Sequence, residues 1–192
     1  MTENDQPGPP AGGPEVLHLP RFELHQKFAM TTNVYRVVAG GLDVAEAKQK
    51  RMALKERVTF RDAEGHEAFS FAARQVIDLG ATYDVVAADG APLATFSKDF
   101  AKSLARSTFT LEGPGYAATG VERSQGVAIL RRVMDIPFLP IHFDFTSADG
   151  TILTVERKPT MRDRYAVEVP DPRVDWRVAA SVAVALDAMM QR

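Results

Sequence analysis

The residues with the clearest chemical potential are basic side chains that gather in two parts of the chain. The first group holds five cations within ten residues, and the alternation of an extended strand would place Lys48 and Lys50 on one face. Such groups attract a phosphate or an anionic headgroup through their local field and the geometry of Arg. The alternative is a solvated surface balanced by Glu46, Glu56 and Glu122. The first group is Lys48, Lys50, Arg51, Lys55 and Arg57, and the second is Arg123, Arg131 and Arg132.

The sequence shows no comparably clear group of catalytic residues. The sequence has no cysteine and no Gly-x-Ser-x-Gly elbow, so two common forms of an activated nucleophile are missing. Ser107 and Ser124 lie near the ends of expected strands, and we interpret them as turn or edge hydroxyls. The sequence therefore predicts a protein that is not an enzyme. The alternative is a hydrolase whose pocket residues are scattered through the chain.

Patterns of metal ligands are equally sparse. His142 and Asp144 alternate onto one face of an expected strand, but no further ligand follows at a metal-binding spacing. Asp89 and Asp149 are single acids in turns, where Asp bonds to its own backbone, whereas calcium loops carry several acids at alternate positions. We predict no metal and no other cofactor.

The elements that carry these side chains are repeated β-hairpins. Residues 83–98 and 143–158 each place aromatic and aliphatic residues around an Asp-Gly turn and end in Lys, and residues 58–73 repeat the pattern around Glu64-Gly65. Short polar turns favour antiparallel neighbours, and about twelve strands are too many for one flat sheet, so we expect a closed antiparallel barrel. The expected strands are Phe22–Phe28, Val34–Ala39, Val44–Lys50, Arg57–Asp62, Glu67–Ala73, Ala81–Ala87, Pro92–Lys98, Ser107–Glu112, Tyr116–Arg123, Ile141–Ser147, Thr151–Lys158 and Arg164–Val169.

The last segment reads as a helix that is apolar on almost every side. Asp175 stands where an N-cap is expected, and the uncharged run from Val178 to Leu186 has nine residues. A bilayer-spanning helix needs about 20 apolar residues, so we predict no transmembrane segment and a helix buried inside the barrel. We expect Asp187 to reach the barrel mouth and meet water or an Arg, and the alternative is a buried polar anchor that sets the register of the helix. A second helix is expected over residues 126–133.

Length and composition bound the domain organisation. The 192 residues, 45% hydrophobic and 25% charged, suit one globular domain. Residues 1–20 are rich in Pro and Gly and contain no Lys or Arg, so we expect a disordered tail followed by a single domain over residues 21–192. Without the three acids of the tail, the domain has 23 basic and 22 acidic residues, which gives no global attraction to nucleic acid. The lack of cysteine and of a secretory signal favours the cytoplasm.

Taken in order, these features resemble the LURP-one-related family, which shares its fold with Tubby C-terminal domains and phospholipid scramblases. The resemblance rests on the Asp-Gly hairpins that end in Lys, on Ala47-Lys-Gln-Lys-Arg, and on an ending that runs from Arg162 through Asp175 to Asp187. It covers roughly residues 21–192 and implies a barrel of twelve strands around a C-terminal helix. Relatives bind phosphoinositides or move phospholipids, but the Lys and Arg residues of the Tubby pocket have no residue-by-residue match here.

We therefore predict a non-enzymatic module that peripherally binds an anionic lipid headgroup or other anionic ligand, or a protein partner, through the basic groups. A hydrolytic enzyme and a purely structural interaction domain stay open as alternatives. A pocket with convergent acids and bases would favour the enzyme, and a shallow basic surface would favour the binding module.

Overall fold

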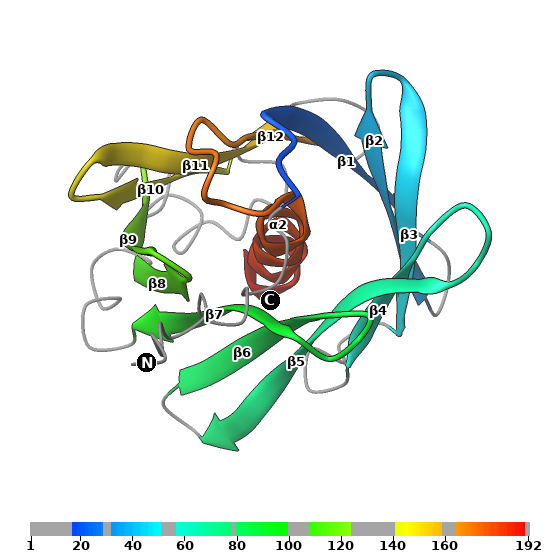
Figure 1. Cartoon of the computed structure of the whole chain (residues 1–192), viewed down its shortest axis with the longest axis horizontal. Coiled ribbons are helices and arrows are strands. Elements are labelled where there is room, and N and C mark those ends of the chain that lie inside the picture. The colour runs from blue at the N-terminus through cyan, green and yellow to red at the C-terminus, as the bar shows by residue number, and fades with distance from the viewer. Residues whose placement is uncertain are drawn as a thin grey trace, which may run out of the picture.

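A closed barrel of twelve strands surrounds one helix, α2 (Trp176–Met190), in the described part of the chain (Figure 1). The computed structural model describes residues 17–28, 32–50, 57–77, 80–99, 108–123, 141–158 and 164–190. Each strand pairs antiparallel with its neighbours in sequence, and β1 pairs with β12 to close the barrel. The strands are β1 (Arg21–Phe28), β2 (Thr32–Ala39), β3 (Leu42–Lys50), β4 (Val58–Arg61), β5 (Glu67–Ile77), β6 (Gly80–Ala87), β7 (Pro92–Asp99), β8 (Thr108–Gly113), β9 (Tyr116–Glu122), β10 (His142–Ser147), β11 (Gly150–Lys158) and β12 (Arg164–Glu168).

The predicted fold class is confirmed, and every expected strand overlaps an observed one. The largest difference is in β5, which continues beyond Ala73 to Ile77 while paired with β6. A shift of register between Ala73 and Gln75 absorbs one residue, so the ladder continues past the point where the hydrophobic alternation weakens. The helix expected over residues 126–133 lies outside the described residues.

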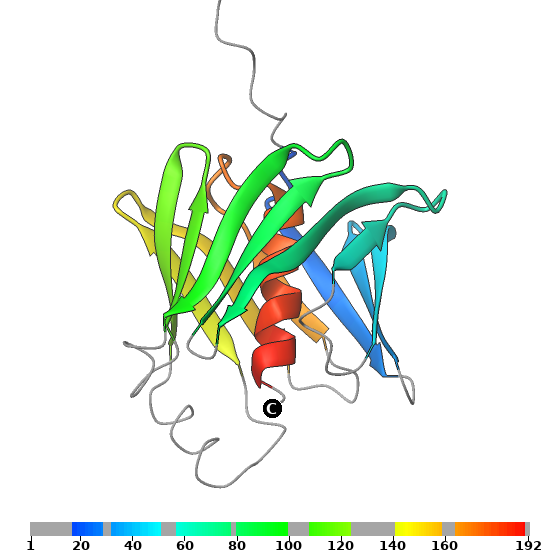
Figure 2. The ribbon, with the colours of Figure 1, turned by 90° about the horizontal axis from the view of Figure 1, so that it is seen from below.

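The core lies between the inner wall of the barrel and α2. Alternate strand residues such as Leu24 and Phe60 are fully buried, and Phe69 packs edge-on against Trp176 with ring centroids 5.3 Å apart. The helix is buried from Val178 to Asp187, as its all-round apolarity predicts. Figure 2 shows α2 running along the inside of the barrel. Its small residues let the strands approach closely.

One close approach in the wall depends on a glycine. The ring of Phe145 on β10 lies over Gly120 on β9, the residue that pairs with it across the strands. A Cβ at Gly120 would lie 2.3 Å from that ring, well inside van der Waals contact. Only glycine therefore fits beneath Phe145 without moving the aromatic side chain.

The start of α2 is capped by Asp175, as predicted, and is hydrogen-bonded to Leu17 in the segment that precedes β1. Asp175 accepts hydrogen bonds from the backbone N–H of Arg177 (2.8 Å) and of Leu17 (3.0 Å), and the N–H of Trp176 donates to the carbonyl of Leu17 (3.0 Å). The N–H of Val169 donates to Pro20 (2.8 Å). Of the segment expected as a tail, residues 17–20 are thus held against the barrel by hydrogen bonds, whereas residues 1–16 lie outside the described part.

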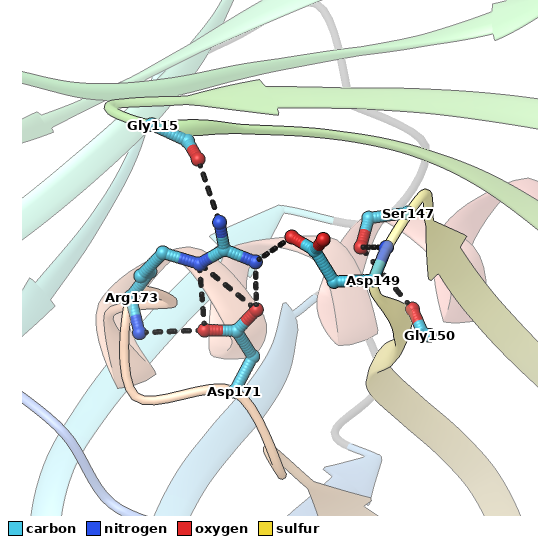
Figure 3. Close-up of polar contacts among 6 residues, drawn as sticks. All are labelled: Gly115, Ser147, Asp149, Gly150, Asp171 and Arg173. Atoms are coloured by element: carbon cyan, nitrogen blue, oxygen red, sulfur yellow. Dashed lines mark hydrogen bonds and ion pairs between the residues drawn. The ribbon is translucent and has the colours of Figure 1, made fainter.

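Arg173 connects this end of the barrel to two hairpin turns (Figure 3). Its guanidinium donates to Asp171 in the same loop (2.6 Å), to Asp149 in the β10–β11 turn (2.8 Å) and to the carbonyl of Gly115 in the β8–β9 turn (3.0 Å). The hydrogen bonds from Arg173 hold the pKa of Asp171 below its usual range. Both turn acids were predicted to bond their own backbone. Asp89 does so at the N–H of Ala91 (2.9 Å), whereas the carboxylate of Asp149 instead accepts from Arg173 across the barrel end.

The far end of α2 is held by a buried polar cluster. Asp187 is fully buried and accepts hydrogen bonds from the hydroxyl of Tyr35 (2.8 Å) and from that of Tyr165. The Tyr35 oxygen in turn accepts from the side-chain amide of Gln26 (3.2 Å). Burial, and then the charge of Asp187, raise the pKa of Tyr35. The expectation that Asp187 reaches the barrel mouth is therefore wrong, and the alternative of a buried anchor is correct.

Candidate anion-binding site

A hollow of about 540 Å³ lies on the outer wall of the barrel where β3 meets β4. These two strands pair at only two positions, Glu46 with Arg61 and Ala47 with Phe60. The walls of the hollow come from two outward residues of β3, from residues 57–61 and from the turn that follows β4. We call this region the hollow, and its described lining is Glu46, Lys48, Arg57, Thr59, Arg61, Asp62, Ala63, Glu64 and Gly65.

The pleat of β4 directs its polar residues into the hollow. Val58 and Phe60 are buried in the barrel, so Arg57, Thr59 and Arg61 point outward on the opposite face. On β3 the buried residues are Ala45 and Ala47, which leaves Glu46 and Lys48 on the outer face. The same alternation that builds the core therefore gathers three cations and a hydroxyl at one place on the wall.

The three cations of the hollow differ in how strongly the protein holds them. Arg57 donates to Glu67 (2.8 Å) and to the hydroxyl of Ser70 (2.9 Å), which positions its guanidinium. Lys48 is 71% exposed, and its ammonium lies 3.6 Å from Glu46. Arg61 donates to the backbone carbonyl of Gly65 (2.9 Å), and it has no ion pair with a carboxylate of the described residues.

Two of the three acids in the lining are already engaged by donors of the protein. Glu46 lies 3.3 Å from Nε of Arg36 and 3.6 Å from the ammonium of Lys48. Asp62 accepts a hydrogen bond from the N–H of His66 (2.8 Å). A phosphate or carboxylate placed between Lys48, Arg61 and the hydroxyl of Thr59 would therefore meet donors, with the charge of Glu46 already offset.

The described lining offers little for covalent or metal chemistry. None of its nine residues is His, Ser, Cys or Tyr, so the usual pairing of a nucleophile with a base is missing from this lining. Elsewhere in the described ranges, no three His, Asp or Glu side chains converge to hold a metal ion. The arrangement is suited to binding an anion.

The predicted basic residues fall into different places. Lys48 and Arg57 both line the hollow, and Lys50 is the last residue of β3. Arg123 directly follows β9 and donates two hydrogen bonds, of 2.7 and 2.8 Å, to the carboxylate of Asp144. Four predicted residues lie outside the described part of the chain: Arg51, Lys55, Arg131 and Arg132.

Arg61 and Thr59 line the hollow but were not among the predicted site residues. Both alternate with Arg57, and Arg61 stands just before the Glu64-Gly65 turn, so a strand period of two would have placed them on the same face. Their nearness to Lys48 carries no such signal, because it depends on the pairing of β3 with β4.

The carboxylate of Asp144 lies between His142 and Arg123 and forms an ion pair with Arg123. The imidazole Nε2 lies 3.4 Å from Asp144, whose carboxylate also accepts from Arg123 and from the hydroxyl of Thr154 (3.1 Å). Burial alone would raise the pKa of Asp144, but the hydrogen bonds from Arg123 and Thr154 outweigh it and hold that pKa low.

Comparison with known proteins identifies the family of the chain. No curated protein and no solved structure matches it. Within the described ranges, no helix is both long and apolar enough to cross a membrane. A model of the LURP-one-related family matches residues 44–187, which include β4 to β12 and most of α2, with the hollow and Asp187. The chain therefore belongs to the LURP-one-related family.

Proposed function

We propose that this protein is a non-enzymatic module of the cytoplasm that binds an anionic lipid headgroup at the hollow, from the surface of a membrane. The observation that carries the proposal is Arg61, which lines the hollow together with Lys48 and Arg57 and whose guanidinium has no carboxylate partner among the described residues. Arg presents several N–H donors in a planar fork that fits phosphate and carboxylate oxygens.

The existing ion pairs of the hollow would offer little resistance to such a ligand. The pair between Lys48 and Glu46 is long and exposed, and exposed pairs contribute about 0–1 kcal/mol to stability. A phosphate could therefore take over the ammonium of Lys48 at small cost. Arg57 would keep its bonds to Glu67 and Ser70 and would act as a fixed positive charge at one edge.

A co-sedimentation experiment with lipid vesicles tests the proposal. The probe is a set of vesicles that mix phosphatidylglycerol with phosphatidylcholine, compared with vesicles of phosphatidylcholine alone, at about 50 mM and about 500 mM salt. We expect binding to the anionic vesicles at low salt that Lys48→Gln/Arg61→Gln weakens about tenfold or more, because each cation near an anionic surface contributes about 1 kcal/mol.

A matched control variant separates the hollow from general charge. Arg74→Gln/Arg123→Gln also removes two exposed cations, which are paired with Asp84 on β6 and Asp144 on β10. It should bind the vesicles almost as well as the native chain. Equal loss in the two double variants, or no preference for the anionic vesicles at low salt, would rule out a headgroup site in the hollow. Inorganic pyrophosphate, added at constant ionic strength, should compete with the vesicles if the hollow takes a phosphate.

A further inference from the structure

Closure of the barrel sets four basic side chains side by side on the outer wall. Arg164 on β12 pairs with Lys158 on β11 and with His25 on β1, and His25 pairs with Arg36 on β2. Paired residues of antiparallel strands point to the same side, and their inward neighbours, such as Leu24, are buried. The four side chains are 30% to 44% exposed. We call Lys158, Arg164, His25 and Arg36 the basic row.

Acids lie beside the basic row on two of its four strands. Two residues along β11 and β1, toward the end where α2 begins, the outward positions are Glu156 and Glu23, whereas the matching positions of β12 and β2 are Ala166 and Val38. On the other side of the row, toward the end where α2 finishes, Lys27 and Lys48 are exposed and point outward. Figure 2 shows this relation, since β1 and α2 both run from the upper to the lower end of the barrel. Asp43 on the neighbouring strand β3, which pairs with Val38, is a third acid at this height.

His25 stands where the basic row meets the acidic positions. Its Nε2 lies 2.7 Å from Glu23, whose carboxylate also accepts from the ammonium of Lys158 (3.1 Å) and lies 3.9 Å from Arg164. The hydrogen bonds from His25 and Lys158 hold the pKa of Glu23 below its usual range. The charged groups that surround His25 are Glu23 and Lys27 on β1, Arg164 on β12 and Arg36 on β2.

We propose that the basic row, with Lys27 and Lys48, is the face that lies against an anionic bilayer, and that protonation of His25 strengthens this contact. This inference rests on the proposed function and adds its orientation and its regulation. Imidazole is the side chain that ordinarily changes charge between about pH 5 and 8. A protonated His25 offsets Glu23, the acid closest to the row, and leaves Lys158 and Arg164 more attractive to phosphates.

The dimensions favour a surface over a single small ligand. Adjacent strands lie about 4.8 Å apart, so a row on four neighbouring strands extends about 15 Å across the wall. Glu46 and Arg61 continue the same line of paired residues from Arg36 to the edge of the hollow. The row and the hollow would therefore meet the same membrane side by side.

The test compares vesicle binding at about pH 5.5 and about pH 7.5 with the full-length chain. Phosphatidylglycerol mixed with phosphatidylcholine is the probe, because its phosphodiester keeps its charge over this interval. We expect the native chain to bind about fivefold more tightly at the lower pH, the effect of about one added charge at an anionic surface. His25→Gln should remove the difference, and His25→Lys should bind tightly at both pH values. His142→Gln, which alters a histidine that also neighbours an acid, should keep the difference.

The outcomes separate this inference from the proposed function. If the native chain binds anionic vesicles equally at both pH values, or if His25→Gln keeps the fivefold difference, the role of His25 is overturned while the hollow is unaffected. Lys48→Gln/Arg61→Gln should lower binding at both pH values and leave their ratio unchanged. A pH difference that persists with phosphatidylcholine alone would also overturn the inference, because it would not depend on anionic lipid.

Discussion

The buried cluster around Asp187 yields the sharpest prediction about stability. Asp187→Ala removes the acceptor of two hydroxyl donors, those of Tyr35 and Tyr165, inside a barrel where little water can replace it. Each buried donor left without a partner costs about 1–3 kcal/mol, so the free energy of unfolding should fall by about 2–6 kcal/mol. For a chain of this size, a loss of about 4 kcal/mol corresponds to a fall in Tm of about 8–16 °C.

Chemical denaturation followed by tryptophan fluorescence measures this loss, since Trp176 packs in the core at the other end of the helix. Asp43→Ala is the matched control, because its carboxylate is 61% exposed and its removal should change stability by less than about 0.5 kcal/mol. Replacing the carboxylate and both hydroxyls by apolar groups, in Asp187→Leu/Tyr35→Phe/Tyr165→Phe, should recover at least half of the loss. Two results would refute this reasoning: a triple variant that is no more stable than Asp187→Leu alone, or an Asp187→Ala variant that unfolds like the native chain. Either would show that the loss of stability does not come from tyrosine hydroxyls left without an acceptor.

Three further predictions concern the core, the N-terminal residues and alkaline pH. Val184→Asp should prevent folding, because it places an unpaired charge on the fully buried helix, and a soluble variant with a cooperative melt would contradict this model. Removal of residues 1–16 should leave Tm unchanged, whereas removal of residues 1–20 should lower it by several degrees, because the second deletion removes the bonds to the start of α2. Burial raises the pKa of Tyr35 and Tyr116, so the unfolded chain loses these protons first as the pH rises above about 10, and stability should then fall with pH. The last prediction can be checked by following phenolate absorbance and circular dichroism together as the pH rises. It would be contradicted if all the tyrosines ionised before the circular dichroism signal of the folded protein was lost.

Local chemistry determined much of this fold. The Asp-Gly turns and the period of two defined the hairpins, because a strand buries alternate residues whatever its partners are. The all-round apolarity from Val178 to Leu186 likewise required a buried helix, and Asp175 marked its first turn. Lys48 and Arg57 were recognisable as neighbours because they are close along the chain.

Tertiary structure alone decided which distant residues meet. Asp187 was expected at the barrel mouth because its sequence neighbours give no sign of Tyr35, which is 152 positions away and faces the same lumen. The basic row has the same origin, since Lys158 and His25 share one carboxylate only because β1 pairs with β12 when the barrel closes. The hydrophobic pattern of the sequence shows which face of its own strand a residue occupies. Closure of the barrel decides which strands lie beside that strand, because the backbone hydrogen-bonding groups of every edge strand need a partner.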